Sequence, residues 1–412
     1  MILKIKRSLF KLLDSVVNKQ TNKTLKIAND LNNSDLYYWC FCTTIGELNA
    51  CKSLIKEIPE KYQLVLFTDR DIYEESYLKA FPQAIVITLD GGLAECQSIA
   101  SKFPPSKVLV CEIPIRLHDA PCRLSFELLY LAKKLNAPIH LVNGWLYHYS
   151  PSCKQDAFER YLFDVDYLNL FDLITVQTNE VKEEIESIIG KSKKLHVTGN
   201  MKFDALSDKS FIFKDHISER LLELYKDCED PIFIAGCVSQ FWEYDLVLNA
   251  YKQAIETLPN LKLIIAPRHP ENTEHMAYLT TKLAEVTKQG QLKSEIKNQP
   301  EVLDSVLVLN TVGELKAYYS IADLCYVGKN HNVLEPLAFN KPIAVKDDWE
   351  KTYPSYPVYR ATLSAKLICE VKDSTQLYEW IEKSSPMFSF SNNTLDTLTG
   401  ATNLNIKHLR LS

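Results

Sequence analysis

A short polar loop at residues 328–332 is the part of the chain best suited to bind a phosphate. It follows an apolar run at 324–327 and precedes a helical pattern that starts at Leu334. A loop that leads from a strand into a helix exposes backbone N–H groups and the positive end of a helix dipole. Glu335 lies one turn further on, where its carboxylate could reach ribose hydroxyls. The alternative is a capped helix that binds nothing. The candidate ligand-binding residues in the loop are Lys329, Asn330, His331 and Asn332.

Two further turns of the second half could contact the same ligand. Arg268 follows an apolar run, and its planar guanidinium suits a phosphate or a carboxylate, with His269 beside it. Thr311 and Gly313 open the next turn, whose backbone amides are a second place for phosphate or ribose contacts. For the side chains of Thr311 and Glu314 we favour a capping box over a ligand contact.

Cys237 follows Gly236 at the end of the first apolar run of the second half. We expect this thiol to lie near a helix N-terminus, which would lower its pKa and expose it. The alternative is an inert buried cysteine.

Polar residues also follow strand patterns in the first half. Glu47 could act as a general base on a hydroxyl, or could simply complement the dipole of the helix that it opens. Glu112 is a second carboxylate at the same predicted edge, or one partner of a salt bridge. Lys202 could meet a carboxylate or phosphate, or be a solvated lysine at a hinge between domains.

The elements that must position these residues alternate between strand and helix. Near-continuous apolar strands separated by helices predict an α/β fold with parallel, doubly wound sheets, and polar residues at the strands' carboxyl ends. The predicted strands are residues 38–43, 63–67, 84–88, 107–111, 139–142, 173–176 and 195–199, then 232–235, 262–266, 306–309, 324–327 and 343–345.

Length and composition suit two globular domains. We expect an N-terminal domain at 1–206, a second domain at 207–384, and a C-terminal tail at 385–412 that returns to the first domain. The formal net charge of -5 argues against a nucleic-acid partner. The 11 scattered cysteines lack metal-ligand spacing and predict reduced thiols in a cytoplasmic protein. We expect no metal, since the chain has no Asp-x-Asp at a strand end.

The N-terminal residues 2–17 have an apolar stripe at helical spacing and basic residues opposite it. Such a helix either lies on an anionic membrane or packs on its own domain with solvated lysines. We therefore list a peripheral contact with the inner membrane among the expected interactions.

Five motifs in order resemble the Kdo (3-deoxy-D-manno-oct-2-ulosonic acid) transferases. The resemblance covers roughly residues 37–346. It implies a GT-B fold, in which two Rossmann-like domains face a central cleft, with the CMP-Kdo donor held by the second domain and the acceptor by the first. The motifs are TIGE at 44–47, GNMKFD at 199–204, RHPE at 268–271, TVGEL at 311–315 and HNVLEP at 331–336.

The resemblance also implies roles for single residues. Arg268 would bind the CMP phosphate or the Kdo carboxylate, residues 330–332 the phosphate, and Glu335 the ribose. Glu47 matches the proposed general base of the inverting lipid A enzymes. No cofactor is implied, because CMP-Kdo is a substrate.

The acceptor half departs from the lipid A enzymes at residues 112–116 and 143–147, so we expect an acceptor other than lipid A. The chain is more similar to the retaining β-Kdo transferase modules of O-antigen assembly. Those modules imply an aspartate nucleophile where this chain has Cys237, so we expect an impaired enzyme whose Cys237 is an engineered or divergent replacement of that aspartate.

Three functions remain open from the sequence. The first is a retaining transferase that moves Kdo to a lipid-linked or oligosaccharide acceptor in lipopolysaccharide biosynthesis, by double displacement at position 237. The second is an inverting α-Kdo transferase with Glu47 as base. The third is an inactive glycan-binding or scaffolding module, working with other glycosyltransferase modules as partners.

Overall fold

The structure is a computed structural model of residues 1–412. It describes residues 2–17, 36–42, 44–68, 70–89, 92–112, 126–146, 162–163, 165–207, 209–211, 213, 215–287, 290–298, 300, 303–351, 353–384 and 395–411. The chain forms two compact units, Met1–Ala205 with Leu398–Ser412, and Leu206–Thr397.

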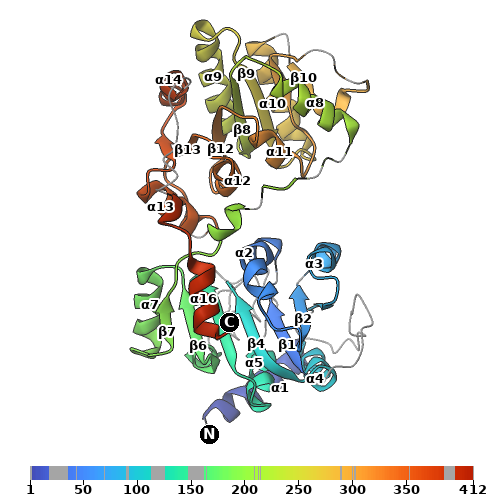
Figure 1. The fold of residues 1–412 in the computed structure, drawn as a ribbon, viewed down its shortest axis with the longest axis vertical. Helices are drawn as coiled ribbons and strands as arrows, with labels where there is room; N and C mark the ends of the chain where they lie inside the picture. Colours follow the sequence, from blue (N-terminus) through green and yellow to red (C-terminus); the bar gives the residue numbers. More distant parts are fainter. Residues whose placement is uncertain are drawn as a thin grey trace. The chain divides into compact units, whose positions relative to one another are not determined.

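The first unit is built on a seven-stranded parallel sheet with the order β3-β2-β1-β4-β5-β6-β7 (Figure 1). The order reverses direction between β1 and β4, and ligands of open α/β sheets bind at such switch points. The strands are β1 (Tyr37–Phe41), β2 (Gln63–Thr68), β3 (Ile85–Thr88), β4 (Pro105–Cys111), β5 (Ile139–Gly144), β6 (Leu173–Val176) and β7 (Leu195–Val197). The helices include α1 (Ile2–Val17), α2 (Ile45–Lys56), α3 (Glu74–Ala80), α4 (Leu93–Lys102), α5 (Phe126–Lys134), α7 (Asn179–Ile189) and α16 (Ala401–Leu409).

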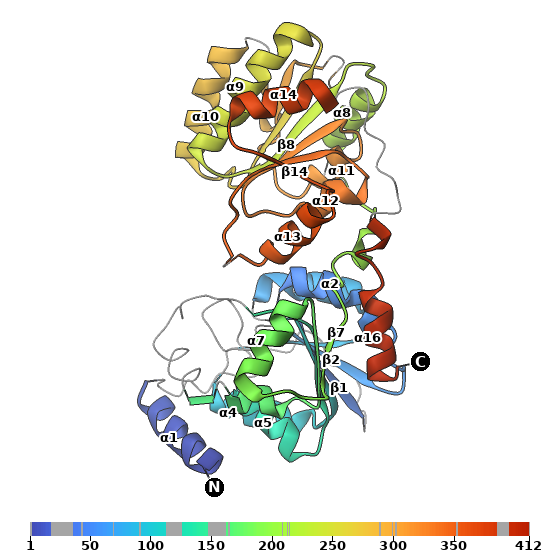
Figure 2. The same cartoon turned by 90° about the vertical axis from the view of Figure 1, so that its left-hand side faces the viewer.

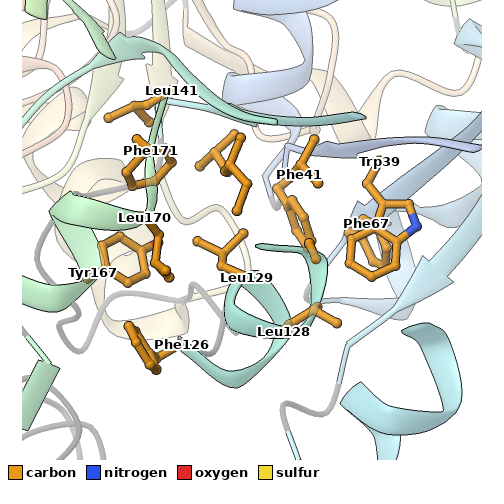
Figure 3. Close-up of a cluster of buried hydrophobic side chains, with 14 of the residues drawn as sticks. Trp39, Phe41, Phe67, Phe126, Leu128, Leu129, Leu141, Tyr167, Leu170 and Phe171 are labelled. Carbon is orange, nitrogen blue, oxygen red and sulfur yellow. The ribbon is translucent and has the colours of Figure 1, made fainter. Parts of the chain in front are cut away.

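Strand side chains alternate between the two faces of this sheet, and each face has its own core. Trp39 and Phe41 join Phe67 on the face covered by α4, α5 and α7 (Figure 3). Tyr38 and Cys40 point to the other face, which α2, α3 and α16 cover. Because both faces are buried, the strands are apolar throughout, as the sequence pattern predicted.

The second unit has its own seven-stranded parallel sheet, with the order β10-β11-β9-β8-β12-β13-β14. Its switch point lies between β8 and β12. The strands are β8 (Ile232–Val238), β9 (Lys262–Pro267), β10 (Gly290–Leu292), β11 (Val306–Val308), β12 (Leu324–Val327), β13 (Ile343–Lys346) and β14 (Cys369–Val371). The helices are α8 (His216–Lys226), α9 (Phe241–Thr257), α10 (Thr273–Val286), α11 (Leu315–Tyr319), α12 (Leu334–Ala338), α13 (Tyr356–Ser364) and α14 (Ser374–Ser384).

Helices α9, α10 and α14 pack together over one face of this second sheet (Figure 2). The predicted α/β fold class with parallel sheets is confirmed. The sequence analysis missed the short edge strands β10 and β14, which have only three residues each.

Helix α1 lies against the first unit through its basic residues. Arg7 forms a bidentate ion pair with the buried Glu127 of α5, at 2.9 and 2.6 Å, and its guanidinium lies 3.5 Å from the centroid of the Tyr130 ring. Lys6 pairs with Asp166 at 2.6 Å. The helix thus packs on its own unit, with Lys6 and Arg7 paired rather than solvated, while Lys4 is exposed. None of the helices in the described parts of the chain is long and apolar enough to span a membrane.

Helix α16 completes the first unit from the far end of the sequence. The Asp204 carboxylate accepts hydrogen bonds from the backbone N–H groups of Gly400 and Thr402, both at 2.6 Å. Those N–H groups begin the helix and would otherwise lack partners. Residues 385–394 of the predicted tail, and residues 113–116 and 147 of the predicted acceptor-side departures, lie outside the described residues.

Candidate functional site

Strand β8 ends in a bulge at the switch point of the second sheet. Its pairing with β9 shifts register between Gly236 and Val238, so Cys237 is the extra residue. Cys237 has φ = 57°, in the left-handed region. Asn and Asp are enriched several-fold in that region among residues other than glycine. The bulge therefore re-aims the side chain of residue 237 at a point where α/β proteins bind ligands.

The bulge and the loop after β12 touch each other through glycines. The Gly328 N–H donates to the Gly236 carbonyl at 2.9 Å. A Cβ on Gly328 would lie 2.1 Å from the Cys237 carbonyl oxygen, and a Cβ on Gly236 would lie 1.9 Å from the Tyr319 hydroxyl oxygen. Both positions therefore require glycine for close approach.

Arg268 and Glu335 lie close enough to Cys237 to act on the pKa of its thiol, and the His331 ring lies beside Gly328, which contacts Cys237. Burial, reinforced by the charges of Arg268 and His269, lowers the pKa of His331 to about 4, so its imidazole is neutral at pH 7. Burial raises the pKa of the Glu335 carboxyl, while Lys316, Arg268 and a hydrogen bond from Asn332 oppose the rise. The site thus places one guanidinium, one neutral imidazole and one carboxyl group around position 237.

The expected lowering of the Cys237 pKa is wrong. Burial and the nearby Glu335 raise the thiol pKa to about 12, despite the opposing charge of Arg268. Cys237 belongs to β8 and not to a helix N-terminus, because α9 begins only at Phe241. The thiol is therefore protonated at pH 7 and is a weak nucleophile.

Several polar groups of the 328–332 loop are already bonded within the protein. Asn330 exchanges two hydrogen bonds with Glu350, at 3.1 and 2.9 Å, and its φ is 65°. The Lys329 N–H donates to Glu243, and Asn332 accepts from the Leu334 N–H at 3.0 Å. Asn332 thus bonds the first backbone N–H of the short helix α12, although Val333 is the residue at its N-cap. Phosphate binding by this loop stays a prediction. Because the Asn330 side chain is bonded to Glu350, other groups of the loop would have to contact the phosphate.

His269 is bonded to Glu271 and not to this group of residues. It is exposed, and its Nδ1 lies 3.0 Å from Glu271. Arg268 is fixed in place by its backbone, whose N–H donates to the Val238 carbonyl at 2.8 Å. The residues before α10 thus bring Arg268 to the bulge, while the ring of His269 is engaged with its neighbour.

In the turn at Thr311 and Gly313, the side chains of Thr311 and Glu314 do not form the predicted capping box. The capping box is wrong, because α11 begins at Leu315 and Glu314 points inward. Glu314 accepts hydrogen bonds from the hydroxyls of Thr311 and Ser218 and pairs with Lys293 at 3.2 Å. Gly313 has φ = 92°, so the turn requires glycine there.

In the first unit, Glu47 and Glu112 lie on either side of the switch point between β1 and β4. Glu47 forms a capping box with Thr44, in which each backbone N–H donates to the other's side chain at 3.3 Å. The Glu112 carboxylate is buried and pairs with Lys202. Both carboxylates lie near the Cys42 thiol. Glu47 thus caps a helix and Glu112 forms a salt bridge, as the two alternatives predicted. A catalytic role of either carboxylate stays a prediction.

A buried network of amides that the sequence analysis missed supports Lys202. Asn143 accepts from the Met201 N–H at 2.9 Å, Asn200 accepts from the Lys202 N–H at 3.0 Å, and Gln177 accepts from Asn200 at 2.9 Å. Asn143 is part of β5, and Gln177 and Asn200 follow β6 and β7. Asn200 stands in the GNMKFD motif, but the sequence did not predict that the three amides would bond to one another.

Glu243 is a second residue that the sequence analysis missed. It lies in the first turn of α9 and is 0% exposed. Its carboxylate accepts hydrogen bonds from Ser239, just after the bulge, and from Tyr326 and Lys329 at the end of β12. In the sequence, Glu243 resembles any acidic residue in the first turn of a helix, so nothing pointed to its role.

Comparison with known proteins finds similarity to one family of transferases. A family model described as 3-deoxy-D-manno-octulosonic-acid transferase (kdotransferase) matches residues 124–205. The 3-deoxy-D-manno-octulosonic acid transferase of Haemophilus influenzae is 27% identical over 213 residues, which cover 50% of this chain and 47% of that protein. The Chlamydia trachomatis serovar A enzyme of the same name is 27% identical over 330 residues, which cover 74% of this chain and 68% of that protein. The chain resembles the Kdo transferases.

A bifunctional glycosyltransferase/methyltransferase of Fusobacterium nucleatum is 23% identical over 347 residues, covering 80% of this chain and 50% of that protein. The chain spans about half the length of this relative and of the Haemophilus protein. Among solved structures, a UDP-GlcNAc 2-epimerase from Methanocaldococcus jannaschii has a TM-score of 0.61 at 14% identity and covers 92% of this chain and 99% of its own. A glycosyltransferase from Rickettsia africae has a TM-score of 0.57 at 11% identity with the same coverage. These likenesses support the predicted two-unit GT-B fold.

Within the described ranges, no group of three or more His, Cys, Asp or Glu side chains could hold a metal ion. The expectation of a metal-independent reaction stays a prediction.

Proposed function

We propose that this chain is a CMP-Kdo-dependent glycosyltransferase that moves Kdo to a hydroxyl of a bacterial surface glycan. One observation carries the proposal. Arg268, His331 and Glu335 gather around position 237 at the switch point of a parallel sheet, in a chain that resembles Kdo transferases over three quarters of its length. In this proposal Arg268 binds the CMP phosphate or the Kdo carboxylate, and Glu335 holds the ribose.

We favour a retaining reaction through position 237 and a β-Kdo product. The left-handed backbone there suits an aspartate. An aspartate carboxylate would attack the anomeric carbon of Kdo while the bond to the CMP oxygen breaks and CMP leaves. The acceptor hydroxyl would then attack the same carbon, lose its proton, and displace the carboxylate. Two inversions retain the configuration.

Cys237 makes the present chain a poor catalyst in this scheme. With a thiol pKa of about 12, only about one thiol in 10⁵ is ionised at pH 7. A glycosyl group on sulfur would also leave slowly. The proposed chain therefore binds CMP-Kdo but turns it over weakly, whether Cys237 arose by engineering or by divergence.

The proposed acceptor is a lipid-linked or oligosaccharide chain of O-antigen or lipopolysaccharide assembly, and the proposed place is the cytoplasmic face of the inner membrane. The exposed apolar residues of α1, Ile5, Leu9 and Leu12, support a peripheral membrane contact. Other glycosyltransferase modules are proposed partners. One relative that the chain matches is a bifunctional glycosyltransferase/methyltransferase, in which a glycosyltransferase is joined to a second enzyme.

Intact-protein mass spectrometry after incubation with CMP-Kdo tests the proposal. We expect a mass increase of one Kdo residue that maps to position 237 in the Cys237→Asp variant. NMR of the product should show the β anomer. An α anomer would instead support inverting transfer with Glu47 as base, and no CMP binding at millimolar concentration would support the inactive module.

A further inference from the structure

A single buried carboxylate joins the two loops that meet at the candidate site. We infer that Glu243 is the positioning residue that holds the loop at residues 328–332 in register with the bulge at position 237. The identity of the ligand in this inference rests on the proposed function. The positioning role of Glu243 rests only on hydrogen bonds within the second unit.

The Glu243 carboxylate accepts four hydrogen bonds, divided between the two loops. Oε2 accepts from the Ser239 N–H at 2.9 Å and from the Ser239 hydroxyl at 3.2 Å. Oε1 accepts from the Lys329 N–H at 2.7 Å and from the Tyr326 hydroxyl at 3.2 Å. One oxygen thus holds the chain just after the bulge, and the other holds the start of the phosphate-binding loop. Glu243 is 0% exposed, so these bonds are shielded from water.

The two loops have little freedom once Glu243 holds them. Gly328 already donates to the Gly236 carbonyl at 2.9 Å and packs against the Cys237 carbonyl. A shift of the loop away from Glu243 would break this contact and leave the partly buried Lys329 N–H without this partner. The spacing between residue 237 and residues 329–332 therefore depends on the carboxylate. In the proposed reaction that spacing sets the distance between the attacking group and the leaving phosphate.

Both oxygens of Glu243 face a backbone N–H, so a carboxamide cannot replace the carboxylate. In Glu243→Gln, one rotamer points the NH₂ group at Ser239 and the other points it at Lys329. Either way one partly buried backbone N–H faces another donor. Asp323→Asn is a matched control, because Asp323 links the same two strands at their opposite ends, accepting from the Ile232 N–H at 2.8 Å.

Hydrogen exchange and calorimetry together test the inference. In the ligand-free protein, we expect Glu243→Gln to speed amide exchange in peptides covering residues 326–332 and 237–240 by about tenfold, the factor for a buried donor that loses its partner. Strands β9 and β11 should exchange as in the unsubstituted chain. Calorimetry with CMP should show affinity about tenfold weaker for Glu243→Gln and unchanged for Asp323→Asn.

The exchange and calorimetry results test the positioning role of Glu243, and CMP binding by the unsubstituted chain tests the proposed function. Unchanged exchange in both loops would overturn the positioning role, and so would faster exchange throughout the second unit, which would mark Glu243 as merely structural. Faster loop exchange with full CMP affinity would also overturn it. If the unsubstituted chain does not bind CMP, the proposed function fails, while the exchange data still decide whether Glu243 holds the two loops.

Discussion

At position 237 a thiol occupies the place where the proposed double displacement would require a carboxylate. We predict that Cys237→Asp raises the rate of CMP release from CMP-Kdo by at least about 100-fold, because a carboxylate is ionised at pH 7 and the thiol, with a pKa of about 12, is not. A continuous assay of CMP release with excess oligosaccharide acceptor measures this. Cys369→Asp, at an exposed cysteine of β14, is the control and should leave the rate unchanged. An equal or lower rate for Cys237→Asp would remove position 237 from the mechanism.

His331 should make the protein less stable in mild acid. Its pKa is lowered to about 4 in the folded state, against about 6.5 in the unfolded chain, so the unfolded state binds the proton first. Stability from this group is complete above pH 6.5 and is lost as the pH falls from 6.5 towards 4, by up to about 3 kcal/mol. Urea unfolding at pH 7, 6, 5 and 4 should show a smaller loss for His331→Gln than for the unsubstituted chain.

Glu335 acts in the opposite direction, since burial raises its folded-state pKa above the unfolded value. As the pH falls, the Glu335 carboxyl is protonated in the folded state before it is protonated in the unfolded state. Acidification through the folded-state pKa of Glu335 therefore adds stability. Comparing His331→Gln with the unsubstituted chain cancels this contribution, because both retain Glu335. Parallel stability curves for the two proteins between pH 7 and 4 would contradict the predicted contribution of His331.

Sequence located the site residues but not their electrostatic surroundings. Arg268, His331 and Glu335 were placed at one edge because each follows a predicted strand or opens a helix. The direction of the Cys237 pKa shift was wrong because it depends on burial and on Glu335, a residue about 100 positions away. Distances between side chains of different elements are not encoded in local sequence patterns.

At the scale of elements, close packing of β8 against α11 should make Gly236 irreplaceable. A Cβ at this position would lie 1.9 Å from the Tyr319 hydroxyl oxygen and 3.0 Å from a Leu315 methyl carbon. We predict that Gly236→Ala costs about 2 kcal/mol of stability, measured by urea unfolding.

Tyr319→Phe should rescue part of this loss, because it removes the nearest clashing atom. That hydroxyl has no hydrogen-bond partner in the described structure, so Tyr319→Phe alone should change stability little. A double variant no more stable than Gly236→Ala would show that the hydroxyl is not the source of the clash.

Helix α1 should bind anionic membranes through the side that it leaves exposed. Its cations Lys6 and Arg7 pair with the first unit, while Ile5 and Leu12 are 60% and 64% exposed. We predict that the protein sediments with phosphatidylglycerol vesicles and that Ile5→Ser with Leu9→Ser lowers its affinity about tenfold, since each substitution removes an apolar side chain from the contact. Ile72→Ser, at an apolar residue 76% exposed elsewhere in the unit, is the control. Equal sedimentation of all three proteins would contradict a role for α1.

Element prediction failed where contacts from distant segments replace local ones. The Thr311 and Glu314 spacing is typical of a capping box, yet Glu314 turns inward to Lys293 and Ser218, which lie on other elements. Likewise, the spacing of α1 predicted a basic face, but not that Lys6 and Arg7 would pair with acidic residues of the first unit. Local patterns indicate which residues share a face, whereas tertiary partners decide which face is buried.

At the scale of the whole molecule, both units place their candidate residues at a topological switch point. Glu47 and Glu112 flank the one between β1 and β4, and Cys237 and Gly328 flank the one between β8 and β12. The alternation of strands and helices predicted this layout, because parallel sheets wound in two directions always contain such a point. The strand order itself, including β11 between β9 and β10, could not be predicted from alternation alone.

The stability of the first unit should depend on α16, although α16 is distant from the rest of that unit in sequence. Asn405 is buried, accepts from the Thr175 hydroxyl at 2.5 Å, and donates to the Thr198 hydroxyl at 3.1 Å. We predict that Asn405→Ala destabilises the first unit by about 2 kcal/mol, since it leaves two buried hydroxyls without their partner.

The second unit should not respond, because these contacts all lie within the first. Peptide-resolved hydrogen exchange across a urea titration distinguishes the units: protection of β5 and β6 should be lost at lower urea, while protection of β8 and β9 stays constant. Asn403→Ala, at an exposed position of the same helix, should change neither. Equal loss in both units would mean that they unfold as one cooperative body, and no loss in either would mean that α16 does not stabilise the sheet beneath it.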